Sequence, residues 1–315
     1  MHDKFKEQIL VAELFLYALN AVGPIFLMVG AGYLFKQKRL IDDSFVRHAN
    51  ILVFYFALPA YIFLSISKAE FGELIDSRAL AAIIAGTLVT FIISLAVSYK
   101  KPFRGAFVQA ATRSNATLLG LALIHNTLGE SGTAIAASVL AVLIPLANIL
   151  SLIVLLNWRH ANLRKQIMVF IKNPLLISIF AGIIASLLRI PIPGIFNGLL
   201  ELLARLSLPL ALIGIGGSLT AQLKFTNVQY LGWVTLLKNV CYPIVTVLIG
   251  WMLGLSMQVI TVLFLISASP TAVSAYVMAD ATGNDAEFTA SAIIVTTTAS
   301  VVTISAGLII LRILL

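Results

Sequence analysis

Residues 258–279, QVITVLFLISASPTAVSAYVMA, form an apolar run long enough to cross a membrane, and Ser269-Pro270-Thr271 lies near its middle. Proline inside a helix removes a hydrogen bond and clashes with the preceding turn, but it is favourable in the first turn of a new helix. Ser269 is a favourable N-cap residue. The run therefore predicts one helix that ends and another that begins near the bilayer centre. The alternative is a proline kink that is repaired by packing.

The composition of the whole chain indicates a polytopic membrane protein. Of the 315 residues, 60% are apolar and 11% are charged, against usual shares of ~45–50% and ~25%. At roughly 20 apolar residues per span, the chain has room for about ten spans and almost no extramembrane domain. These figures exclude a soluble enzyme, a DNA-binding protein and a receptor with a large ectodomain.

Charged breaks such as KQKR at 36–39 and KKPFR at 100–104 separate the apolar segments. We expect ten spans, at 11–35, 45–66, 79–99, 105–125, 133–157, 173–190, 195–220, 228–255, 258–279 and 286–311.

The loops between the spans carry most of the basic residues. Twelve Lys and Arg lie on one side of the membrane and six on the side that holds both termini. By the positive-inside rule the twelve-residue side is cytoplasmic, so we expect both termini to be non-cytoplasmic. The same rule explains the net charge of +8, so we expect membrane lipid and no nucleic acid as a partner.

A weak internal repeat appears at a shift of 150 residues. Pro24 corresponds to Pro174, and Leu58-Pro59 corresponds to Leu208-Pro209. This shift is also the distance from the first span to the sixth. Because five spans is an odd number, a second copy must insert upside down, as in many secondary transporters. We therefore expect two inverted repeats, over 1–160 and 161–315.

Seven segments together resemble the auxin efflux carrier family, in order and over nearly the whole chain. They are ANILVFYFALPAYIF at 49–63, RSNATLLGLAL at 113–123, KNPLLIS at 172–178, LSLPLALIGIGGSL at 206–219, LKNVCYP at 237–243, SASPTAVSAYVMA at 267–279 and GNDAEFTASAIIVTT at 283–297.

This resemblance implies an all-α integral membrane protein of ten helices in a five-plus-five inverted repeat, with broken helices 4 and 9 crossing at the substrate site. It implies export or exchange of organic anions by an elevator motion in a plasma membrane, the inner membrane in bacteria. Plant members carry auxin, and bacterial relatives are linked to malate or malonate. One departure is Ala122, where the family has proline in helix 4.

The two predicted groups of helices follow from the resemblance and the repeat. Helices 1, 2, 6 and 7, which hold the matched prolines, are expected to form a scaffold, and helices 3–5 and 8–10 a mobile transport unit. Helices 2 and 7 are expected to make a homodimer contact.

The predicted substrate site lies where the fourth and ninth spans cross. Its residues are Arg113, Ser114, Asn115, Ser269, Pro270 and Thr271. We expect Asn115 to cap the second half of helix 4 and to offer its amide to a carboxylate. An arginine near mid-membrane costs at least ~2.5 kcal/mol, so Arg113 should face a cavity or a carboxylate. Alternatively it reaches a cytoplasmic vestibule or joins two helices.

Three further residues are candidates for charge pairing or coupling. Lys238 lies inside the eighth span and needs a partner, which is Asp280, Glu287 or the substrate. The pair is either structural or mechanistic, and in the second case the lysine replaces a bound cation. Asp280 and Glu287 are also candidates for a titrating carboxylate, although Asn284 and Glu287 have the spacing of a capping box.

The chain carries no recognisable enzyme motif, and more than one class of transporter remains open. The chain has no metalloprotease, serine-hydrolase or phosphate-loop motif, and the single Cys241 excludes a cysteine metal site. We therefore expect no cofactor, no metal and no enzyme. The leading prediction is a secondary active or potential-driven carrier of small organic anions. The alternatives are a sodium-coupled symporter of the bile-acid type, a cation/proton antiporter and a gated channel.

Overall fold

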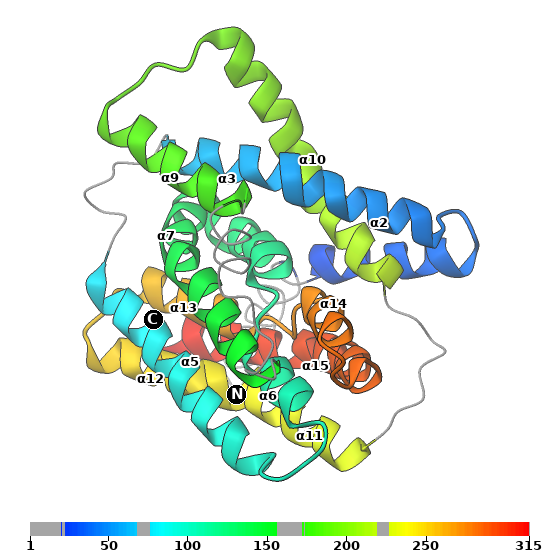
Figure 1. The fold of residues 1–315 in the computed structure, drawn as a ribbon. Coiled ribbons are helices and arrows are strands. Elements are labelled where there is room, and N and C mark those ends of the chain that lie inside the picture. The colour runs from blue at the N-terminus through cyan, green and yellow to red at the C-terminus, as the bar shows by residue number, and fades with distance from the viewer. Residues whose placement is uncertain are drawn as a thin grey trace, which may run out of the picture.

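The computed structural model describes residues 20, 23–67, 76–155, 172, 174–218 and 227–314. Most of them are helical, and they include no strand beyond one isolated bridge (Figure 1). Residues 11–19, 21 and 22 of the first predicted span lie outside the described residues.

A first helix covers residues 23–37. The elements that follow are α2 (Asp43–Leu52), η1 (Val53–Ala57), α3 (Leu58–Ser67), α5 (Ser77–Val97), α6 (Arg104–Thr112), η2 (Ala116–Gly120), α7 (Leu121–Leu155), α9 (Pro174–Leu187), α10 (Gly194–Ser218), α11 (Val228–Leu236), η4 (Leu237–Cys241), α12 (Tyr242–Met252), α13 (Met257–Ala268), α14 (Ser274–Ala281) and α15 (Ala286–Ile313).

Aspartate side chains cap the N-termini of three of these helices. The Asp42 carboxylate accepts a hydrogen bond from the backbone N–H of Phe45, which caps α2. Asp76 caps α5 and Asp285 caps α15 in the same way. The expected capping box with Asn284 at the N-cap is therefore wrong by one residue. The Asn284 amide is held instead by the backbone oxygen of Leu155, to which it donates over 2.9 Å.

Glycine 129 divides α7 into two helical parts. Its backbone has φ 67° and ψ −152°, a region that is open almost only to glycine. The helix therefore breaks at Gly129, within the predicted boundary between the fourth span and the fifth.

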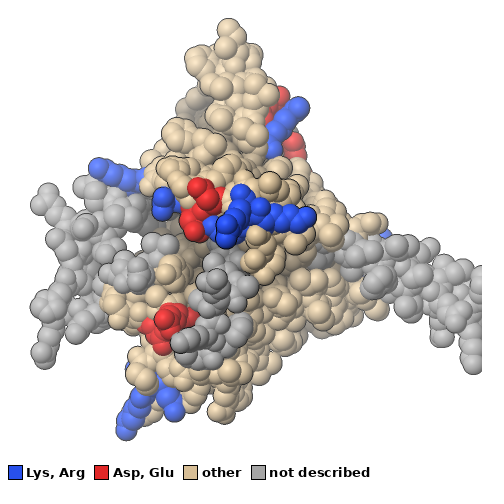
Figure 2. All heavy atoms as spheres, turned by 90° about the vertical axis from the view of Figure 1, so that its right-hand side faces the viewer, with Lys and Arg blue, Asp and Glu red and all other residues tan. Residues whose placement is uncertain are grey.

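The described helices include several that are long and apolar enough to span a membrane. Six segments qualify, at Asp43–Leu64, Ser77–Val97, Ala116–Leu155, Gly194–Gly217, Val228–Met252 and Ala286–Ile313. Large apolar side chains such as Ile195 and Met252 are exposed. On the face in Figure 2, charged side chains form a few separate groups in a mostly uncharged surface. These features indicate an integral membrane protein.

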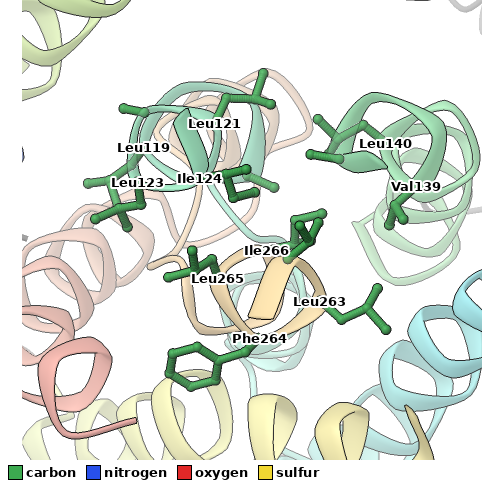
Figure 3. Packing of buried hydrophobic residues seen from close by; sticks show 14 of the residues in the cluster. Leu119, Leu121, Leu123, Ile124, Val139, Leu140, Leu263, Phe264, Leu265 and Ile266 are labelled. Carbon is green, nitrogen blue, oxygen red and sulfur yellow. The ribbon is translucent and has the colours of Figure 1, made fainter. Parts of the chain in front are cut away.

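Helix α13 lies at the centre of the helical core. Its residues from Ile260 to Ala268 are all buried, as expected for a helix that is packed on every side. Leu263, Phe264, Leu265 and Ile266 point in different directions, toward α7 and the surrounding helices (Figure 3). A helix in this position is held firmly, so its end is a well-placed support for a site.

The helices pack in two groups. Helix α10 contacts α2 and α3, and α3 contacts α9. The N-terminal part of α10 extends away from the rest in Figure 1. Helices α5, α6, α7, α11, α12, α13, α14 and α15 form the other group. Contacts of α3 and α9 with α7 join the two groups. Both interruptions described below belong to the second group.

Candidate functional site

Two short non-helical segments lie side by side in the second group of helices. One separates α6 from η2, between Thr112 and Ala116, and the other separates α13 from α14, between Ala268 and Ser274. The segments run antiparallel, with Ser114 opposite Thr271. We refer to residues 113–115 and 269–273 together as the bridged segments.

Backbone hydrogen bonds join the bridged segments directly. The N–H of Asn115 donates to the Pro270 oxygen over 2.7 Å, and the N–H of Ala272 donates to the Arg113 oxygen over 2.9 Å. These bonds satisfy groups that would otherwise be unpaired in the protein interior.

The residues around Pro270 differ from their predicted roles. The second half-helix begins at Ser274 and not at Pro270, and Ser269 caps the end of α13 instead of the start of α14. The hydroxyl of Ser269 donates back to the Leu265 oxygen over 2.6 Å. A residue before proline is forced into extended backbone, and Ser269 has φ −55° and ψ 136°.

Thr271 keeps the chain extended beyond the proline. Its N–H donates to Thr296 Oγ1 of α15 over 3.2 Å, and its hydroxyl donates to the Ala110 oxygen of α6 over 2.7 Å. Thr271 is fully buried. Pro270 and Thr271 therefore fix the shape of the bridged segments, and their backbone groups are used within the protein.

Arg113 is held at the bridged segments by neutral side chains. Its Nη1 donates to Asn148 Oδ1 over 2.7 Å and to Ser151 Oγ over 3.4 Å, and its Nε donates to Ser274 Oγ over 3.3 Å. Among the described side chains, no carboxylate lies within ion-pair distance of it. The guanidinium joins α7 to the start of α14. None of the described carboxylates compensates its positive charge.

Two buried polar atoms of residues close to Arg113 in the chain have no hydrogen-bond partner among the described residues. They are Gln109 Oε1 of α6 and Ser114 Oγ. Asn115 occupies the N-cap position of η2, but its side chain makes no capping hydrogen bond. A buried polar atom without a partner costs about 1–3 kcal/mol. Such atoms are available to a bound polar molecule.

Lys238 lies in the π-helical turn η4 and is fully buried. Its ammonium donates to the Ser267 oxygen at the end of α13 over 2.5 Å and lies 4.7 Å from the centre of the Tyr242 ring. Glu287, one of the three predicted partners of Lys238, is exposed in the first turn of α15, and the described residues show no ion pair between the two side chains. Asp280 belongs to α14, but its side chain lies outside the described part of the structure.

Sequence reasoning missed some of the groups that contact Arg113. Asn148 and Ser151, which lie one helical turn apart on α7, and Ser274 are not among the predicted site residues. The three-residue spacing of Asn148 and Ser151 was the available signal, because residues at that spacing share a helix face.

A surface pocket of about 220 Å³ lies elsewhere, between α5, α7 and α13. The residues that line it include Asp76 and Ser256 and none from the bridged segments. A carboxylate in the lining disfavours binding of an anion, so we assign no substrate to this pocket.

Comparison with known proteins identifies the family. The membrane transport protein family matches residues 17–168 and 158–307, nearly the whole chain. The chain belongs to this family. It is the family of auxin efflux carriers and malonate permease-like proteins that the sequence resembles, so that prediction is confirmed.

Two bacterial relatives of this membrane transport family are similar over most of their length. A Rhizobium meliloti protein described as "Putative malonate transporter" is 25% identical over 314 residues, which cover 92% of this chain and 94% of the relative. An Escherichia coli protein described as "Uncharacterized transporter YfdV" is 25% identical over 271 residues, 81% of this chain and 85% of the relative. The family and these relatives indicate a membrane transporter and not an enzyme.

Proposed function

We propose that this protein is a secondary transporter of small organic anions such as carboxylates, which exports or exchanges them across the bacterial inner membrane. The observation that carries the proposal is the Arg113 guanidinium, held only by neutral described side chains beside two interrupted helices. Membership of a membrane transport family supports it. A gradient of the anion or the membrane potential drives the carrier.

The bridged segments favour an anion mainly because of charged side chains. The partial charges of the helix ends contribute less. An N-terminus carries roughly +0.5 charge and a C-terminus roughly −0.5. The N-termini of η2 and α14 meet the C-termini of α6 and α13 here, so their partial charges largely cancel. Among the described side chains, the full positive charges here come from Arg113 and Lys238.

Within the proposed site, the residues have different roles. Arg113 pairs with the carboxylate, while the Ser114 hydroxyl and the Asn115 amide supply hydrogen bonds. Ser269, Pro270 and Thr271 hold the bridged segments in place, because their polar groups bond within the protein. A site of this kind holds an organic anion reversibly without a metal.

In the proposed transport cycle, the two packing groups of helices have different roles. Residues 23–37, α2, α3, α9 and α10 form the scaffold, and the group that contains both bridged segments moves the site across the membrane. In the ten-helix inverted repeat that we propose, these segments are the breaks in helices 4 and 9. Exposed apolar side chains of α10, such as Phe196 and Leu202, are available for a homodimer contact.

The alternative transport classes need different groups at the site. A cation/proton antiporter needs a carboxylate at the crossing, and residues 113–115 and 269–273 contain none. A sodium-coupled symporter of the bile-acid type predicts that Na⁺ is required for uptake. A gated channel predicts flux that neither saturates nor shows counterflow.

Thermal stabilisation of the purified protein by a panel of ligands tests the proposal. The panel contains mono- and dicarboxylates and, as controls, the neutral amides of the same size, with and without Na⁺ and at neutral and acidic pH. A ligand at about 100 times its Kd stabilises the folded state by about 2.7 kcal/mol. We expect at least one carboxylate, and no amide, to raise the Tm. Equal stabilisation by acids and amides, or by neither, contradicts the proposal.

A further inference from the structure

Lys238 places a positive charge at the point where α13 ends. Ser267, whose oxygen accepts the ammonium hydrogen bond, is the second-last residue of α13. The last carbonyl groups of a helix lack intrahelical partners and carry its partial negative charge. Lys238 therefore satisfies one of these carbonyls with a full positive charge.

Half-helix C-termini and unwound carbonyls are where transporters with broken helices coordinate Na⁺ or H⁺. In this chain an ammonium of the protein itself occupies such a position. The ring of Tyr242 provides a second contact that favours a cation, at 4.7 Å from Nζ. Tyr242 is fixed in turn by a 2.7 Å hydrogen bond between its hydroxyl and Thr87 Oγ1.

We infer that Lys238 is a built-in cation that takes the place of a dissociable coupling ion, so that anion binding at the bridged segments needs no Na⁺ or K⁺. The inference rests on the proposed function and deepens it, because it assigns the source of the compensating charge.

The local backbone supports a positioning role for this turn. Lys238 and Asn239 belong to η4, a π-helical turn in an otherwise α-helical segment, and such turns are frequent at functional sites. The Asn239 amide donates to the Thr296 oxygen over 2.9 Å, while its Oδ1 is buried without a partner among the described residues. Thr296 Oγ1 also accepts the N–H of Thr271. One turn therefore connects the built-in cation to both α13 and the bridged segments.

Removal of the lysine side chain should turn this position into a site for a free cation. Lys238→Ala leaves a cavity beside the Ser267 oxygen and the Tyr242 ring, where methylammonium or an alkali ion can enter. Lys238→Met fills most of the same volume with an apolar side chain and leaves no such room. If Lys238 only joins two helices, both variants should be less stable than wild type, and the Tm of neither should depend on the cation.

The test compares wild type, Lys238→Ala, Lys238→Met and Lys100→Ala with choline, Na⁺, K⁺ or methylammonium as the only cation. Ionic strength is held at about 0.15 M, where exposed charges are screened beyond ~8 Å. Lys100 is exposed and controls for the loss of a lysine elsewhere. The readouts are the Tm without ligand and the affinity for malonate by calorimetry.

We expect wild type and Lys100→Ala to show the same Tm and the same malonate affinity in all four salts. Lys238→Ala should bind malonate at least about tenfold more weakly in choline, and methylammonium, Na⁺ or K⁺ should raise both its affinity and its Tm. Lys238→Met should lose affinity and show no rescue. If Lys238→Ala does not fold, unchanged malonate affinity in Lys238→Met overturns the inference, and lost affinity supports it.

The two readouts separate this inference from the proposed function. If wild type binds no carboxylate, the proposed function fails, while a cation-dependent Tm of Lys238→Ala still supports the cation position. If wild type requires Na⁺ or K⁺ for malonate binding, or if Lys238→Ala has the same Tm in all salts, the built-in cation is wrong.

Discussion

Replacing Arg113 by glutamine separates a binding role from a structural one. The guanidinium makes three hydrogen bonds, to Asn148, Ser151 and Ser274. Glutamine keeps a polar side chain of intermediate length but removes the positive charge. If Arg113 binds the substrate carboxylate, Arg113→Gln loses affinity; if it only joins α7 to α14, the variant loses stability instead.

The size of the effect on affinity follows from the charge and its surroundings. A hydrogen bond to a charged group contributes about 1.5–3 kcal/mol, which corresponds to a loss of roughly 10- to 150-fold in affinity. The effect on stability has two opposing parts. Each of the three hydrogen bonds has the charged guanidinium as its donor and contributes about 1.5–3 kcal/mol, while removal of a half-buried charge without a described carboxylate partner offsets much of this loss.

Calorimetric titration of malonate into monodisperse wild type, Arg113→Gln and Arg113→Lys measures the affinities, and thermal unfolding measures the stabilities. Arg113→Lys keeps the charge and should retain more affinity than Arg113→Gln. Arg104→Gln, at the start of α6, is the control for loss of an arginine outside the site. Wild-type affinity in Arg113→Gln, together with a lower Tm, would refute the binding role.

Four other predictions concern the site, the helix packing, the pH dependence of stability and the topology. Pro270→Ala should weaken malonate binding more than Asn115→Ala, measured by the same titration, because it lets α13 extend and disturbs the bridged segments; the opposite order contradicts this account. Gly216→Ala should destabilise the protein by about 1–3 kcal/mol, because the added carbon overlaps the backbone oxygen of Val29. Gly198→Ala, with open space around it, is the matched control in thermal unfolding and should not destabilise. The Arg78 side chain hydrogen-bonds Asp76 and lowers the pKa of that carboxyl. The resulting stabilisation, under about 1 kcal/mol at such an exposed site, should be present at neutral pH and lost as the pH falls through the lowered pKa; Asp76→Asn should remove this pH dependence of the Tm. A C-terminal reporter that is active only in the cytoplasm should be silent, and a strong signal would reverse the predicted topology.

The sequence predicted that the protein is a helical membrane protein, and it predicted which two helices are interrupted by polar residues or proline. Apolar content and charged breaks are summed over many residues, so they identify this class reliably. The polar run at 113–115 and the proline at 270 marked the bridged segments, because such residues are costly inside a membrane helix.

The local details depend on tertiary contacts that the sequence does not display. Helix α14 starts at Ser274 and not at Pro270 as predicted, because Thr271 and Ala272 form hydrogen bonds to α15, α6 and Arg113. The partner of Lys238 is a backbone carbonyl and not Glu287. Backbone oxygens are present at every residue, so no sequence pattern distinguishes the one that a lysine reaches.

Counterflow in proteoliposomes tests the central claim most directly. Vesicles that contain purified wild type or Arg113→Gln are loaded with unlabelled malonate and diluted into a trace of labelled malonate. The account predicts transient, saturable accumulation of label by wild type in the absence of Na⁺, and little or none by Arg113→Gln. No accumulation of malonate or of any other carboxylate by wild type, or equal accumulation by both proteins, would contradict it.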